Sequence, residues 1–143
     1  MAPLIALVAG FLAARLAGLL GVDVLDGWHP ALRVGLAAMF LLTAFAHFFP
    51  RLRTGLVAMV PPGLPRPELL ITLTGLLELA GAVLLLVPAT TRPASAGLIL
   101  MMIAMFPANV SAARRRLPGV TPIGPRTALQ VLFVAAAALT FAG

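Results

Sequence analysis

Two ionisable residues, Glu78 and His47, stand inside long apolar stretches of the sequence. Glu78 lies in the run TGLLELAG and His47 in the run AHFFP. A charged acid at the centre of a membrane helix costs on the order of 3 kcal/mol, so Glu78 should be protonated, paired or turned towards a wet cavity. Histidine exchanges protons near neutral pH. We therefore expect His47 and Glu78 to be the catalytic residues of any proton-exchange chemistry in this chain.

Three further polar residues stand near the ends of later apolar runs. Asn109 follows Pro107, which cannot donate a backbone hydrogen bond and should bend a helix. Gln130 lies about one helical turn after Arg126. We predict that Asn109, Gln130 and Arg126 bind a ligand. The competing interpretation is structural: Asn109 would bond backbone groups freed by the proline, and Arg126 would be a topology charge.

His47 and Glu78 also have structural interpretations. Gly75, Glu78 and Gly81 follow a three-residue step and fall on one side of a helix, where small residues let another helix approach closely. Glu78 would then be a neutral acid that fixes helix packing. His47 would be an interfacial residue beside aromatic anchors. The sequence leaves both interpretations open.

The elements that position these residues must be membrane helices. Of the 143 residues, 62% are hydrophobic and only 10% are charged, against about 45–50% and about 25% in soluble domains. Five segments approach the roughly 20 apolar residues that a membrane helix needs, and in lipid only helices satisfy such backbones internally. The sequence thus predicts an all-α, polytopic membrane helix bundle with segments at about 3–22, 30–49, 67–87, 93–110 and 126–142.

The arginines predict how the bundle is oriented. All ten basic residues are arginine, and the segments 50–67 and 111–126 hold three and four of them. The positive-inside rule places these segments in the cytoplasm, with the N-terminus inside and the C-terminus outside for five spans. If the first segment lies on the membrane surface, four spans remain in the same orientation. Arginine without lysine, with abundant Ala, Leu, Gly and Pro, indicates a GC-rich bacterial genome, and we therefore expect the membrane to be the bacterial inner membrane.

The first segment and the long loop carry further expectations. Segment 3–22 lacks a basic start, so we expect it to stay in the mature protein. Arg15 interrupts this segment and must snorkel, lie at an interface, or pair with an acid such as Asp23. The Pro-rich loop 50–67 is expected to be a stiff connector, or alternatively a rim or lid over a cytoplasmic site.

Several classes of chemistry find no support in the residues. There is no cysteine, which excludes disulfides and thiolate or iron–sulfur sites within the chain. No ligand spacing predicts a metal site, and no phosphate loop, dinucleotide turn or nucleophile elbow is present. The arginines lie between apolar runs, which indicates contact with membrane lipid and not with nucleic acid.

An ordered set of motifs resembles the DoxX-like family of small bacterial membrane proteins over about residues 29–141. The motifs are HFFP (47–50), VPPGLP (60–65), GLLELAG (75–81), VP with TR (87–92), FPANV (106–110), and Arg126 with LQ (129–130). The resemblance implies a four-helix membrane bundle at 29–143, with residues 1–28 as an extra hydrophobic helix and a short acidic loop. The family takes its name from a subunit of a thiosulfate:quinone oxidoreductase, and relatives are associated with methylamine utilisation and oxidative-stress complexes. Without cysteine, thiol-based roles cannot carry over.

Helix direction brings the polar residues together. His47 and Asn109 end their segments at the side where Arg126 and Gln130 begin theirs, and Glu78 lies deeper. Five polar side chains are thus expected to line one cavity open to the cytoplasm. The leading hypothesis is a redox-associated subunit that binds a quinone or another apolar ligand there, beside oxidoreductase partner subunits. The alternatives are an accessory subunit with no site and a small-metabolite carrier.

Overall fold

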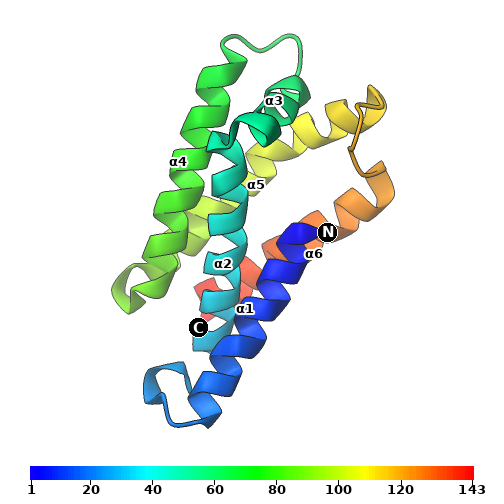
Figure 1. Cartoon of the computed structure of the whole chain (residues 1–143). Helices are drawn as coiled ribbons and strands as arrows, with labels where there is room; N and C mark the ends of the chain where they lie inside the picture. The colour runs from blue at the N-terminus through cyan, green and yellow to red at the C-terminus, as the bar shows by residue number, and fades with distance from the viewer.

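The computed structural model describes all 143 residues, which form helices and no strands (Figure 1). The elements are α1 (Ala2–Leu19), η1 (Asp23–Leu25), α2 (Trp28–Phe48), α3 (Pro50–Met59), α4 (Pro67–Leu86), η2 (Pro88–Thr90), α5 (Thr91–Arg114) and α6 (Ile123–Ala142). All α-helices except α3 are long and apolar enough to cross a membrane. The prediction of an all-α membrane bundle is confirmed, and the chain is a multi-pass membrane protein.

The predicted segments agree with five of the helices, apart from their ends. Prolines stand in the first turns of α1, α3 and α4, where the missing N–H has no helical partner to lose. α5 differs most, because it continues through Pro107 to Arg114 and does not end near Val110. α2 begins earlier than predicted, so His29 also falls within an apolar helix.

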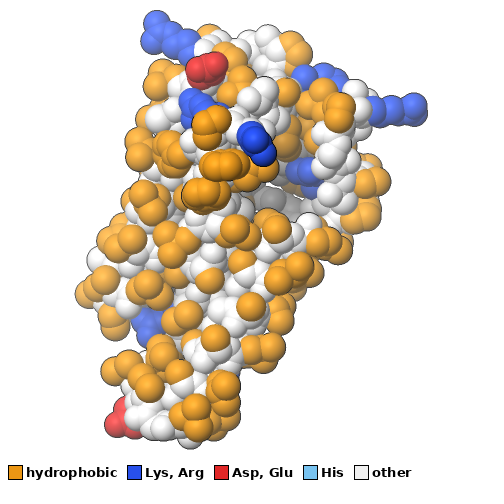
Figure 2. All heavy atoms as spheres, in the orientation of Figure 1, with side chains coloured by type: hydrophobic (Ala, Val, Ile, Leu, Met, Phe, Trp, Pro, Cys, Tyr) orange, Lys and Arg blue, Asp and Glu red, His pale blue; other side chains and the backbone are white.

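Four of the helices form a closed ring. α2 packs against α4, α4 against α5, α5 against α6, and α6 returns to α2, while α1 lies along α2 (Figure 1). Leu36, Met39 and Leu85 are among the fully buried side chains between them. Outside, hydrophobic side chains cover the middle of the visible face, and charged ones gather mostly towards its upper end (Figure 2). This distribution suits a surface in contact with lipid tails.

Small residues bring α1 and α2 close together. A Cβ atom on Gly35 would lie only 2.6 Å from the carbonyl oxygen of Leu7, and one on Gly10 would lie 3.0 Å from Cα of Gly35. Such contact between backbones is how helices associate in lipid. Further along α1, Arg15 pairs with Asp26 at 3.4 Å and not with Asp23. The charge within the first segment is therefore neutralised by an acid, which was one of the three expectations for Arg15.

The sequence suggested a loop over the whole segment 50–67, but part of this segment is helical. Its first half forms α3, because Pro50 occupies the first helical position and no further proline occurs until Pro61. Arg115, the residue that follows α5, donates to the carbonyl oxygens of Met59 and Val60, at 3.0 and 3.3 Å. The end of α3 is therefore attached to the end of α5.

Gly35→Ala tests the close contact of α1 with α2. The new methyl group meets the backbone of Leu7, so α1 must move away, and we expect the free energy of unfolding to fall by about 1–3 kcal/mol. The control is Gly97→Ala in α5, where a Cβ meets nothing within 4 Å and helix propensity should rise. Thermal unfolding in detergent measures both. A Gly35→Ala variant as stable as the control would contradict the described packing.

Candidate functional site

The contact of α2 with α4 places the two ionisable residues next to each other. A Cβ on Gly75 would lie 2.6 Å from Cβ of His47, so the imidazole side chain rests on a turn of α4 that has no side chain there. Glu78 follows one turn later on the same side. His47 is 3% exposed and Glu78 5%. The expectation that Gly75 allows a neighbouring helix to approach is confirmed.

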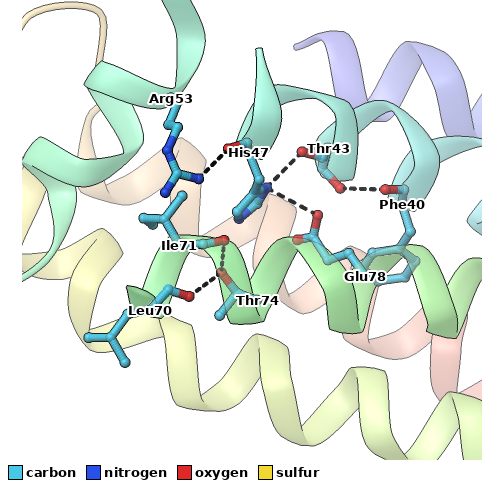
Figure 3. Close-up of polar contacts among 8 residues, drawn as sticks. All are labelled: Phe40, Thr43, His47, Arg53, Leu70, Ile71, Thr74 and Glu78. Carbon is cyan, nitrogen blue, oxygen red and sulfur yellow. Dashed lines mark hydrogen bonds and ion pairs between the residues drawn. The ribbon is translucent and has the colours of Figure 1, made fainter. Parts of the chain in front are cut away.

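The hydrogen bonds of His47 determine which ring nitrogen carries a proton. Nδ1 lies 2.8 Å from the carbonyl oxygen of Thr43, one turn earlier on α2, and 3.5 Å from Oε2 of Glu78 (Figure 3). A carbonyl oxygen only accepts, so Nδ1 is the donor. In the neutral ring, Nε2 is therefore left as a proton acceptor.

Two buried polar atoms at this place have no hydrogen-bond partner. They are Nε2 of His47 and Oε2 of Glu78. A buried polar group without a partner costs about 1–3 kcal/mol, and nearly all such groups in proteins are satisfied by protein or by water. Both atoms can therefore form a hydrogen bond to a molecule outside the chain.

All five residues predicted for the site line one cavity of about 360 Å³. The polar members are His47, Glu78, Asn109, Arg126 and Gln130. The remaining lining is mostly apolar and comes from α1, α2, α3, α5 and α6: Pro3, Met39, Phe40, Ala46, Leu56, Met59, Met102, Met105 and Phe133, with Thr43. The molecular surface is hollowed on the face between α3, α5 and α6 (Figure 2). Helix direction was therefore a sound guide to which polar residues meet.

Hydrogen bonds between α5 and α6 involve the other three site residues, Asn109, Arg126 and Gln130. Nη1 of Arg126 donates to Oδ1 of Asn109 at 2.8 Å, and Nε2 of Gln130 donates to the carbonyl of Met102 at 2.8 Å, in the turn before Pro107. Gln130 on α6, and not Asn109, thus bonds backbone near the proline. Nδ2 of Asn109 and Oε1 of Gln130 make no hydrogen bond within the chain and remain available to a ligand.

Sequence reasoning missed two residues that support the pair. Thr43 precedes His47 by one turn, a spacing that was available as a signal. Arg53 was counted only as a topology charge, yet it donates to the carbonyl of His47 at 2.8 Å and to the carbonyl of Glu68 and the hydroxyl of Thr72, both at 2.9 Å. No spacing in the sequence links Arg53 to Thr72.

These features define a multi-pass membrane helix bundle with a buried histidine–glutamate pair in an apolar cavity. No third metal-ligating side chain joins the pair. The chain belongs to a family described as Domain of unknown function (DUF8561), whose model matches residues 36–141. The match contains all five predicted site residues and leaves α1 outside. No curated protein and no solved structure matches the chain.

Arg53→Gln tests the attachment of α3 to the cavity. The substitution removes charged hydrogen bonds that together join α3 to α2 and α4, each contributing about 1.5–3 kcal/mol. We expect amide hydrogen exchange in residues 50–59 to accelerate roughly tenfold or more. Arg51→Gln is the matched control, because Arg51 is exposed on the same helix and forms no hydrogen bond. Equal exchange in both variants would show that Arg53 does not hold α3 in place.

Proposed function

We propose that this chain binds a quinone-class ligand, flat and apolar with oxygens that exchange protons, between its helices. The observation that carries the proposal is the pair of buried atoms without hydrogen-bond partners, Nε2 of His47 and Oε2 of Glu78, in one mostly apolar cavity. A chain that needed these residues only for packing would gain stability by bonding both atoms internally. A ligand with hydroxyl or carbonyl oxygens supplies the missing partners.

The dimensions and lining of the cavity suit such a headgroup. Small-molecule sites usually measure about 300–1,000 Å³ and are mostly apolar with a few placed polar groups. Here Met39, Met102, Met105 and Phe133 provide apolar contacts around the polar pair. Thioethers adapt to flat aromatic ligands and interact favourably with their rings. When bound, a quinone supplies reversible two-electron and two-proton chemistry.

The residues of the chain would bind and move protons at defined atoms. Nε2 of His47 accepts a proton from a ligand hydroxyl, while its Nδ1–H stays bonded to the carbonyl of Thr43. Glu78, 3.5 Å from Nδ1, stabilises the resulting imidazolium when ionised, and donates to a ligand carbonyl when protonated. Asn109 and Gln130 orient the ligand through Nδ2 and Oε1. Proton exchange of this kind is a common use of intramembrane His and Glu.

The setting proposed for this site is the bacterial inner membrane. The Arg-rich end, where α3 and the α5–α6 connection lie, faces the cytoplasm under the positive-inside rule, with the N-terminus inside and the C-terminus outside. The resemblance of the motifs to the DoxX-like family supports a redox-associated subunit that works with an oxidoreductase partner. No cysteine is available in the chain, so electrons would pass between the ligand and that partner.

A second candidate is an accessory subunit whose polar residues only fix helix packing. The hydrogen bonds from Arg126 to Asn109 and from Gln130 to Met102 favour it, because they link α5 to α6 as packing contacts do. The two candidates differ at Nε2 of His47 and Oε2 of Glu78, which the packing function leaves without hydrogen-bond partners.

Extraction of the full-length protein purified in detergent tests the proposal. Organic solvent followed by chromatography should recover bound quinone, and His47→Ala and Glu78→Gln should each lower its amount about tenfold, as expected for one lost hydrogen bond to a charged group. His29→Ala and Glu68→Gln are matched controls of the same residue types outside the cavity. Variants that are folded by circular dichroism but retain full quinone, or wild type without quinone, would favour the accessory role.

A further inference from the structure

A second cavity lies at the opposite end of the bundle. It measures about 320 Å³ and is lined by His29 and Arg33 of α2, Thr91 and Arg92 of α5, Thr140 of α6, and Gly143, among others. It shares no residue with the cavity of His47 and Glu78. In Figure 1 the end of the chain lies beside the first turns of α2, where this cavity forms.

The charged side chains around this second cavity are all of one sign. Arg33 and Arg92 both contribute to it, and no Asp or Glu side chain does. The ion pairs of the chain are Arg15 with Asp26 and His47 with Glu78, so no Asp or Glu side chain neutralises either guanidinium. Two like charges beside low-dielectric hydrocarbon repel each other. An anion between them would remove that cost.

A hydrogen bond positions the side chain of Arg33, whereas the side chain of Arg92 forms none. Nη1 of half-buried Arg33 donates to the hydroxyl of Thr91 at 3.2 Å, and that buried hydroxyl donates to the carbonyls of Leu85 and Val87. The other guanidinium nitrogens of Arg33 and all those of exposed Arg92 make no hydrogen bond. The planar guanidinium fork matches phosphate oxygens in a bidentate arrangement.

Membrane topology does not account for Arg33 and Arg92. The positive-inside rule concerns the Arg-rich end, and these two residues lie at the end that is poor in arginine. Trp28, half exposed, lies beside His29 with ring centroids 3.7 Å apart and ring planes tilted by 41°. Tryptophan is enriched at the level of lipid headgroups, which sets the second cavity at that depth.

We propose that the second cavity binds a phosphate group, with Arg33 and Arg92 as its ligands. The phosphate comes from an anionic phospholipid headgroup or from a water-soluble phosphate. Arg33 provides a positioned fork, and Arg92 closes on the anion from α5. Binding there joins the start of α2 to the start of α5 and so stabilises the end of the bundle remote from the first cavity.

Titration of the full-length protein in neutral detergent tests this proposal with two probes, phosphatidylglycerol and inorganic phosphate. Native mass spectrometry and thermal unfolding report binding. We expect saturable binding of one probe with a raised melting temperature, weakened at least tenfold in Arg92→Gln. Binding of phosphatidylglycerol alone identifies a lipid source, and binding of inorganic phosphate identifies a soluble one.

Two further variants keep the result decisive. Arg92 forms no hydrogen bond in the chain, so Arg92→Gln should fold even if Arg33→Gln does not. Arg51→Gln removes an exposed arginine at the other end and should leave the saturable site unchanged. The proposal is overturned if neither probe binds saturably, or if Arg92→Gln and Arg51→Gln bind both probes as wild type does.

Discussion

The spacing between α2 and α4 depends on one contact, in which the His47 side chain lies on the bare backbone turn at Gly75. A Cβ atom at position 75 would lie only 2.6 Å from Cβ of His47, so any side chain there would force the two helices apart. The same contact sets Nδ1 of His47 at 3.5 Å from Glu78, one turn further along α4. One contact therefore serves both the packing of α2 on α4 and the geometry of the His47–Glu78 pair.

Much of the fold was readable from the sequence, because lipid imposes a length and an apolar composition on every spanning helix. α3 was not, since a ten-residue amphipathic helix between prolines has no such signature. The meeting of five polar residues was predictable from helix direction. The partners of individual side chains, such as Gln130 with the carbonyl of Met102, were not. They depend on how each helix is rotated about its axis, and helices that are apolar on most faces carry little information about that.

The treatment of buried polar groups differs between the core and the first cavity. In the core, the hydroxyls of Ser95 and Thr140 lie 2.7 Å apart and bond to each other, and Thr91 bonds backbone carbonyls. Only His47 and Glu78 contribute buried side-chain atoms without partners. Because the chain gives its other buried polar side chains hydrogen-bond partners, these two atoms mark a place where a molecule from outside the chain supplies the missing bonds. Leu36 and Leu85, both fully buried, lie in the apolar core of the same bundle.

The two hydrogen bonds between α5 and α6 have a consequence for the connection between these helices. Arg126 with Asn109 and Gln130 with Met102 fix how far one helix can slide along the other, since a shift of one turn, about 5.4 Å, would break both. The register of the hairpin is thus held inside the bundle and does not depend on the length of the connection at 115–122. That connection, which includes Gly119 at a φ of 75°, is therefore a natural insertion point for an epitope or a reporter that reads the sidedness of the protein in living cells.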